Sequence, residues 1–93
     1  MEIKIELTKE PKVKPDASVL GFGQYFSDHM FLMNWESDKG WHDARIVPFG
    51  DIPMSPAASV LHYGTEIFEG LKAYRTEHGD IVTFRPDLNA DRM

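Results

Sequence analysis

The sequence contains no cysteine among its 93 residues. This absence excludes disulfide bonds, cysteine-ligated zinc, iron–sulfur clusters and thiol nucleophiles. Long apolar runs are also missing, since no stretch approaches the roughly 18 apolar residues of a membrane-spanning helix. Residues 2–7 alternate charged and apolar side chains, unlike the continuous apolar run of a signal peptide. We therefore expect a cytoplasmic protein that has no membrane partner.

Basic side chains are scarce relative to acidic ones. The chain has 10 Lys and Arg against 15 Asp and Glu, which gives a formal net charge of -5. A nucleic acid or an anionic membrane requires a basic face, so we expect neither as a partner. Hydrophobic residues make up 42% and charged residues 27%, an ordinary globular composition that argues against wholesale disorder. A chain of this length forms one domain with a modest core.

The N-terminal part of the chain predicts a strand followed by an arm. Residues 2–7 alternate with a period of two, which is typical of a strand. Residues 8–20 contain five charged side chains and two prolines, which favour an extended conformation. We therefore predict a strand and an extended arm over residues 1–20, and a small domain over residues 21–93.

The next part of the chain predicts a β-hairpin. A dense apolar run over residues 29–35 and a second strand-like segment over residues 41–49 are separated by turn-forming residues 36–40 with a glycine at the end. Two strand-like segments on either side of such a turn are typical of a hairpin. In this arrangement Trp35 and Trp41 flank the turn and are placed to pack as an aromatic pair.

A helix is predicted after the hairpin. Ser55 is a favourable N-cap, and Pro56 suits the first helical position. Apolar residues then recur at roughly helical spacing over residues 57–68. Gly64 weakens this helix, and Gly70 is placed to end it.

The C-terminal part predicts a second hairpin and a short helix. Residues 71–75 and 81–84 are strand-like and are separated by a turn over residues 77–80, while Pro86 opens a helix through residue 93. We therefore predict an α+β fold, a small domain in which an antiparallel sheet of two hairpins packs with helices. Because no cap follows the last helix, we expect a truncated polypeptide.

Histidine and carboxylate patterns give no metal site. None of the four histidines pairs at a helical ligand spacing, and His29 beside Asp28 is a conceivable ligand pair without further ligands at a typical spacing. Glu66 and Glu69 lie three residues apart, so on the predicted helix they share a face. Such a pair is conceivable as glycosidase carboxylates, but two solvated acids are the simpler interpretation. Candidate anion-binding residues are Arg45, Arg75, Arg85 and Arg92.

From residue 21 to residue 93 the sequence resembles the N-terminal part of branched-chain amino-acid aminotransferases. The resemblance rests on an ordered set of short motifs that covers about three-quarters of the chain. These are Phe22 and Gly23, residues 26–30, Trp35, residues 39–41, Arg45 and Ile46, residues 55–57, 61–63, 67–75 and 84–86, and Asn89 with residues 91–93.

The resemblance implies a pyridoxal 5′-phosphate enzyme of fold type IV. Members of the family move an amino group between leucine, isoleucine or valine and 2-oxoglutarate, and the cofactor supplies the electronic chemistry. The expected partners are therefore branched-chain amino acids and 2-oxo acids, together with a second copy of the chain in a homodimer. The small N-terminal domain of the family is normally followed by a larger domain.

The resemblance also implies roles for four residues. Arg92 matches the family's arginine that binds the cofactor phosphate, and a guanidinium suits phosphate oxygens. Phe22, Tyr63 and Phe68 match the residues of the pocket for the substrate side chain. The tyrosine at the position of Tyr63 reaches the pocket of the neighbouring subunit in family dimers.

The lysine that holds the cofactor as a Schiff base in the family has no match in this chain. In the family that lysine lies downstream, in the larger domain, as does the glutamate that pairs with the pyridine nitrogen. We therefore expect no catalytic residue here and no activity of this chain by itself. The lysines present are Lys4, Lys9, Lys12, Lys14, Lys39 and Lys72.

Two alternatives stay open at the level of the sequence. One is a related fold type IV enzyme, such as a D-amino-acid aminotransferase or an aminodeoxychorismate lyase. The other is a stand-alone interaction module that has this fold and no catalysis.

Overall fold

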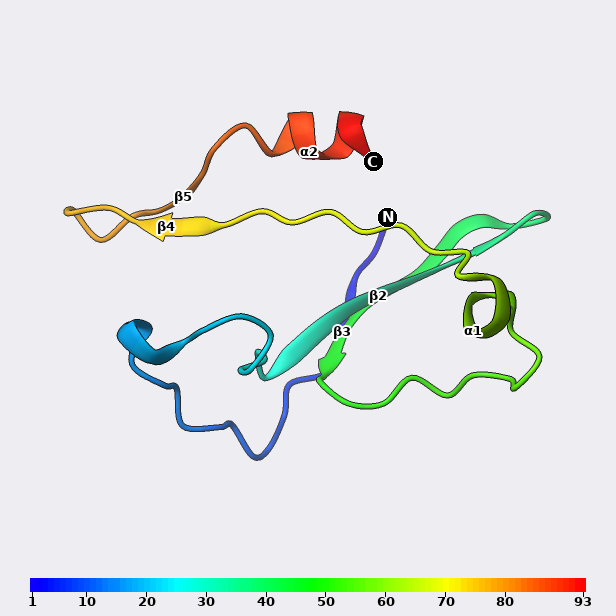
Figure 1. Ribbon diagram of the computed structural model, residues 1–93, viewed down its shortest axis with the longest axis horizontal. Helices are drawn as coiled ribbons and strands as arrows, with labels where there is room; N and C mark the ends of the chain where they lie inside the picture. Colours follow the sequence, from blue (N-terminus) through cyan, green and yellow to red (C-terminus); the bar gives the residue numbers. More distant parts are fainter. The chain divides into compact units, whose positions relative to one another are not determined.

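The computed structural model describes residues 1–93, which divide into two compact units, residues 1–52 and 53–93 (Figure 1). The predicted α+β class is confirmed: one unit contains a three-stranded sheet, and the other contains a two-stranded hairpin and two short helices. Residues 1–20 belong to the first unit, and their separation from a domain over residues 21–93 stays a prediction. Neither α-helix has the length and apolar character that crossing a membrane requires.

The first unit is built on the predicted hairpin. Strands β2 (His29–Glu36) and β3 (Gly40–Pro48) pair antiparallel, which confirms the prediction. Trp35 and Trp41 are opposite each other in the register. The turn between them depends on Gly40, whose φ of 67° lies in the left-handed region that glycine tolerates.

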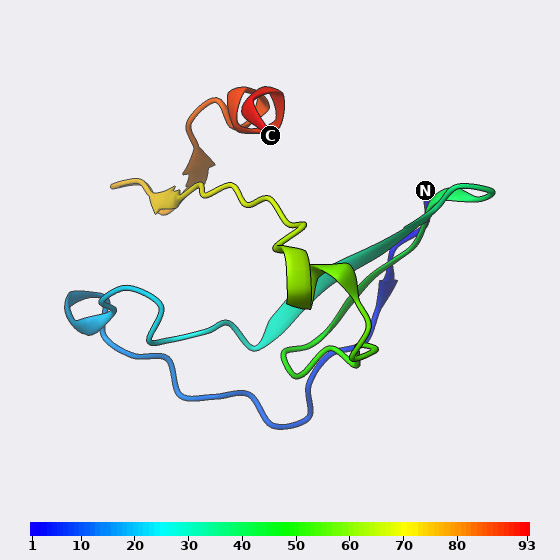
Figure 2. The same ribbon diagram turned by 45° about the vertical axis from the view of Figure 1, so that its right-hand side comes forward.

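The strand β1 (Lys4–Ile5) lies parallel to β3 on the side away from β2 (Figure 2). The strand was predicted from the sequence, but its parallel pairing was not. Parallel strands require a long crossover connection, and here the arm and β2 separate β1 from β3 in the sequence. The amide of Glu6 extends the pairing by donating to the carbonyl of Ile46 at 2.9 Å.

A β-bulge interrupts the hairpin. The register shifts between Leu32 and Asn34, so that Asp43 is the extra residue on β3, with a φ of 54°. Aspartate is one of the few side chains that adopt this left-handed conformation at moderate cost. The guanidinium of Arg45 stabilises the bulge through Nη1, which contacts the carboxylate of Asp43 at 3.0 Å and the side-chain oxygen of Asn34 at 2.8 Å.

The arm contains one short 3-10 helix, η1 (Ala17–Val19), which Asp16 caps by accepting from the amide of Ser18 at 2.8 Å. Elsewhere it is fastened to the first residues of β2. The amide of Thr8 donates to Nε2 of His29 at 2.9 Å. This hydrogen bond holds the arm, which has no regular strand structure at this point, next to the start of β2.

Lys12 is the second fastening point of the arm. Its amide donates to the Asp28 carboxylate at 3.0 Å, and its ammonium donates to the carbonyls of Phe26 and Ser27 at 3.2 Å each. The ammonium also lies 5.3 Å from the centre of the Phe49 ring, which stacks on Phe26 with the ring centres 5.1 Å apart. A cation over an aromatic face is attractive, so one side chain joins the arm to both ends of the hairpin.

In the second unit, the helix predicted over residues 57–68 is wrong in extent. Helix α1 occupies Ser59–Tyr63 and ends at Gly64, whose φ of 58° is the left-handed conformation of a helix C-cap. Residues 64–72 have no regular secondary structure. The predicted capping residue, Ser55, accepts from the amide of Ala57 at 3.1 Å and thus stabilises a turn before the helix.

The predicted second hairpin and last helix are confirmed. Strands β4 (Ala73–Arg75) and β5 (Ile81–Thr83) pair antiparallel. Helix α2 (Pro86–Arg92) begins with a proline at a position where a missing amide proton costs nothing.

Few side chains are buried in either unit. Ala44, next to the bulge, is the one buried residue, at 2% exposure. Large apolar side chains are exposed throughout the chain, including Phe22 at 99% and Phe68 at 93%. The core is therefore smaller than composition predicts.

Candidate functional site

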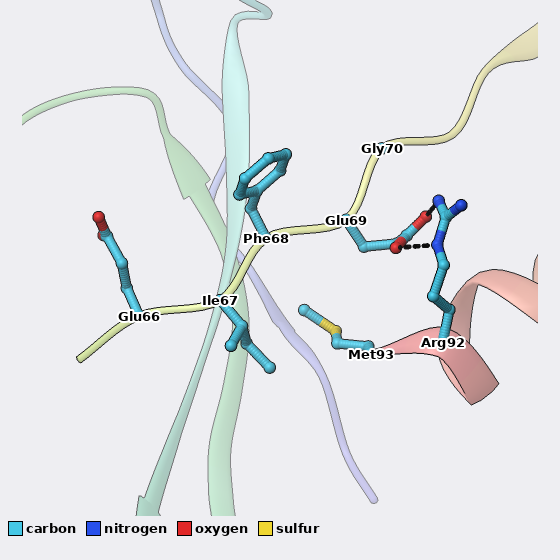
Figure 3. A pocket seen from close by; sticks show the side chains of 7 residues that line it. All are labelled: Glu66, Ile67, Phe68, Glu69, Gly70, Arg92 and Met93. Atoms are coloured by element: carbon cyan, nitrogen blue, oxygen red, sulfur yellow. Dashed lines mark hydrogen bonds and ion pairs between the residues drawn. The ribbon is translucent and has the colours of Figure 1, made fainter. Parts of the chain in front are cut away.

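The candidate site is an open pocket in the second unit with a volume of about 520 Å³. It lies between the irregular segment that follows α1 and the C-terminal end of α2 (Figure 3). The residues that line it are Glu66, Ile67, Phe68, Glu69, Gly70, Arg92 and Met93.

Helix α2 places two polar side chains on one face. Asn89 and Arg92 are three residues apart, a spacing that brings side chains together on a helix. Arg92 is in the last turn, where a positive charge interacts favourably with the helix dipole. The sequence of this short helix thus places an amide and a guanidinium on the side of α2 that faces Glu69.

Glu69 is the acceptor for both of these side chains. The guanidinium of Arg92 binds its carboxylate with two nitrogens: Nε donates to Oε2 at 2.8 Å, and Nη2 donates to Oε1 (Figure 3). The side-chain amide of Asn89 donates to Oε1 at 2.7 Å and to the carbonyl of Gly70 at 2.8 Å. The result is a planar two-point ion pair that a third side chain supports.

The ion pair changes the electrostatics of both partners. Hydrogen bonds from Arg92, and then from Asn89, lower the pKa of Glu69 from 4.5 to about 2. The hydrogen bond to Glu69 in turn raises the pKa of Arg92. The two side chains differ in exposure, since Glu69 is 13% exposed and Arg92 is 72% exposed. At neutral pH the pocket therefore holds a charged pair whose positive member faces solvent.

Apolar side chains form the other walls of the pocket. Ile67 and Phe68 project from opposite sides of the irregular segment, and Met93 follows Arg92 (Figure 3). An exposed guanidinium beside apolar surface can bind an anionic group that is attached to an apolar or aromatic body.

The structure brings two of the four predicted site residues into this pocket. Arg92 and Phe68 both line it. Tyr63, the last residue of α1, is 83% exposed and does not line the pocket, and Phe22 belongs to the first unit. Their predicted roles in substrate binding stay predictions.

The carboxylate pair considered for a glycosidase rests on a helix that the structure does not contain. Residues 64–72 are irregular, and the side chain of Glu66 points away from that of Glu69 (Figure 3). The sequence did not predict that Glu69, which lines the pocket, and Asn89, which contacts Glu69, act together with Arg92. The spacing of Asn89 and Arg92 was visible in the sequence, but their acceptor lies about twenty residues earlier.

The remaining histidines and arginines have structural partners or lie apart from the pocket. His29 accepts from the amide of Thr8, and the neighbouring Asp28 accepts from the amide of Lys12. No group of three or more potential metal-binding side chains comes together. Arg45 is committed to the β-bulge.

Comparison with known proteins adds the family context. No family model matches the chain. It is 54% identical over 91 residues to a probable branched-chain-amino-acid aminotransferase of Staphylococcus aureus (strain MRSA252), and 50% identical over 91 residues to branched-chain-amino-acid aminotransferase 2 of Bacillus subtilis (strain 168). In both comparisons the aligned part is 98% of this chain and 25% of the relative.

A third relative, the branched-chain-amino-acid aminotransferase of Mycolicibacterium smegmatis, is 56% identical over 73 residues, which are 78% of this chain and 20% of the relative. The chain spans about a quarter of the length of the curated relatives it matches. It is homologous to the N-terminal quarter of branched-chain-amino-acid aminotransferases.

Proposed function

We propose that this homologue of the N-terminal quarter of branched-chain-amino-acid aminotransferases supplies the phosphate-binding arginine of such an enzyme. The whole enzyme would transfer an amino group between leucine, isoleucine or valine and 2-oxoglutarate with pyridoxal 5′-phosphate. The observation that carries the proposal is the exposed guanidinium of Arg92, held in the plane of the Glu69 carboxylate in a pocket with apolar walls.

The residues present fit a phosphate group. A guanidinium has five N–H donors on two edges. Glu69 binds Nε and Nη2, so one edge is used, while Nη1 takes no part in the contacts with Glu69. The outer edge suits two phosphate oxygens, and its positive charge is permanent. Arg92 would therefore bind and orient the cofactor's phosphate.

When bound, the cofactor would supply the electron-withdrawing ring that stabilises a carbanion. The contribution of this chain would be binding and orientation. None of the seven residues that line the pocket is a lysine, so the pocket has no amine to which an aldehyde cofactor could attach. We propose that the chain by itself does not transaminate leucine with 2-oxoglutarate.

Three aromatic residues are proposed to contact the substrate. Phe22, Tyr63 and Phe68 are each more than four-fifths exposed and so are available for contacts with another molecule. Aromatic surfaces suit a branched aliphatic side chain because they favour burial without a polar partner. We include in the proposal a homodimer in which Tyr63 reaches the neighbouring subunit's substrate pocket.

The proposed phosphate role can be tested by a comparison of ligands. We would titrate the chain with pyridoxal 5′-phosphate and with pyridoxal, and follow binding by absorbance and fluorescence. The expected result is that Arg92→Ala abolishes the preference for the phosphorylated form. Arg75→Ala is the matched control, because it removes the same charge from an exposed position on β4 in the same unit.

An unchanged preference in Arg92→Ala would refute the phosphate role of this residue. Arg85, which precedes α2, would then be the next arginine to test. The proposal that the chain has no activity alone is tested separately. Glutamate formation from leucine and 2-oxoglutarate above a protein-free control would refute it.

A further inference from the structure

Glu69 is held in place by groups other than Arg92. Asn89 donates to its carboxylate at 2.7 Å and also donates to the carbonyl of the adjacent Gly70 at 2.8 Å. These two bonds fasten α2 to the segment that carries Glu69, whatever Arg92 does. The Glu69 side chain is largely shielded, at 13% exposure. The carboxylate of Glu69 is therefore a fixed acceptor for Arg92. A carboxylate on a mobile side chain would have to lose that mobility before it could hold the guanidinium.

Arg92 is the more exposed partner in this arrangement. Its side chain is 72% exposed, and a long arginine side chain in solvent samples many rotamers. The two bonds to Glu69 restrict it to one plane and occupy its inner edge. An incoming anion then meets a guanidinium that is already oriented, which lowers the ordering cost of binding.

We propose that Glu69, held by Asn89, is a positioning residue that orients Arg92 for an anionic phosphate group. This inference rests on the proposed function, because it assumes that Arg92 is the phosphate-binding residue. It assigns a role to two side chains that do not themselves touch the phosphate. The carboxylate fixes the plane of the guanidinium, and the amide fixes the carboxylate.

A competing role for Glu69 predicts an effect of the opposite sign. If its negative charge merely neutralises Arg92 and repels anions, then its removal should strengthen phosphate binding. If it positions Arg92, then its removal should weaken phosphate binding even though the local charge becomes more favourable. The sign of the change therefore separates orientation from simple electrostatics.

The test is a titration of this chain with inorganic phosphate, followed by NMR. Glu69→Gln and Asn89→Ala are each expected to weaken phosphate binding by about threefold to tenfold, the range that one net hydrogen bond spans. Glu66→Gln is the matched control, since it removes the same charge from the same pocket without removing a contact to Arg92. Its phosphate affinity should equal or exceed that of the parent chain.

A spectroscopic signal reports the orientation directly. In the parent chain the Nε–H of Arg92 donates to Glu69, so its proton should exchange slowly enough to be observed. The signal should be lost in Glu69→Gln and kept in Glu66→Gln. Backbone amide signals of β4 and β5 should stay unchanged in both variants, which shows that the fold of this unit is intact.

The possible failures of the two proposals are distinguishable. If the parent chain does not bind phosphate, or if Arg92→Ala binds it as well as the parent, the proposed function fails and the inference with it. If Arg92→Ala loses phosphate while Glu69→Gln binds it equally or more tightly, the phosphate role stands and the positioning role is overturned. A weakening in Glu69→Gln and Asn89→Ala, with none in Glu66→Gln, supports the positioning role.

Discussion

The carboxylate of Glu69 should stay ionised far into the acid range. Two donors on Arg92 and one on Asn89 bind its two oxygens, and a carboxylate that accepts several such bonds is strongly favoured in its charged form. The pKa of Glu69 accordingly falls from 4.5 to about 2. The experiment is therefore an acid titration of the chain, and the measured quantity is the pH at which half of the Glu69 carboxyl groups are protonated.

The sign of the stability effect follows from the direction of the pKa change. A carboxyl group whose pKa is lowered by folding binds its proton more readily in the unfolded chain. The contribution of the Glu69–Arg92 pair to stability is therefore complete above a pH of about 4.5 and is lost as the pH falls towards about 2. Raising the pH above neutrality should leave the pair unchanged.

The assay is the carbon NMR shift of the Glu69 carboxyl group, recorded as the pH is lowered. We expect the midpoint near 2 in the parent chain and a clearly higher midpoint in Arg92→Ala, because the hydrogen bonds from Arg92, the main cause of the low pKa, are then missing. Arg75→Ala is the control and should keep the midpoint of the parent. A parent midpoint at or above 4.5 would refute the ion pair in solution, and with it the orientation of Arg92.

Three further predictions concern the rest of the chain. Gly40→Ala should destabilise the first unit by about 1 kcal/mol in chemical denaturation, because alanine is strained at a φ of 67°, whereas Gly50→Ala, with open space around it and no positive φ, should have little effect. Equal effects of the two substitutions would contradict the backbone argument. Lys12→Met should speed hydrogen exchange of the Thr8 amide, because the ammonium contacts that hold the arm to Phe26 are lost. Exchange at the parent rate would show that the Lys12 ammonium does not help to hold the arm. The many exposed large apolar side chains should cause self-association, so light scattering over a dilution series should give masses above the 10.6 kDa monomer, and a mass fixed at that value would contradict this.

Local signals predicted much of the fold. The hairpin of β2 and β3 follows from two strand-like segments around a turn that needs glycine, and the left-handed φ at Gly40 is what such a turn requires. The start of α2 follows from Pro86 in the same way. In each of these cases the residues that decide the structure are neighbours in the sequence, so a local pattern contains the necessary information.

The errors arose where two local signals competed. Apolar spacing favoured a helix through Phe68, whereas Gly64 favoured a stop, and the structure ends α1 at Gly64. A prediction from periodicity extends a helix for as long as apolar residues recur at helical spacing. One residue in the left-handed conformation nevertheless ends the helix. The parallel pairing of β1 with β3 was missed for another reason, since no sequence pattern specifies which strand edge a distant segment selects.

The pocket shows why a site is harder to derive than a fold. The resemblance predicts Arg92 and Phe68 as site residues, and both line the pocket. The ion-pair partner of Arg92 was not predicted, because Glu69 was expected on a helix beside Glu66. Once α1 ends early, the backbone around Glu69 is irregular, and its carboxylate becomes available to donors on a helix about twenty residues later. The error in one helix boundary thus concealed the contact on which the proposed orientation of the anion site depends. When a site is formed by separate segments, its contacts depend on the backbone between those segments, so the types of its residues do not by themselves determine which of them meet.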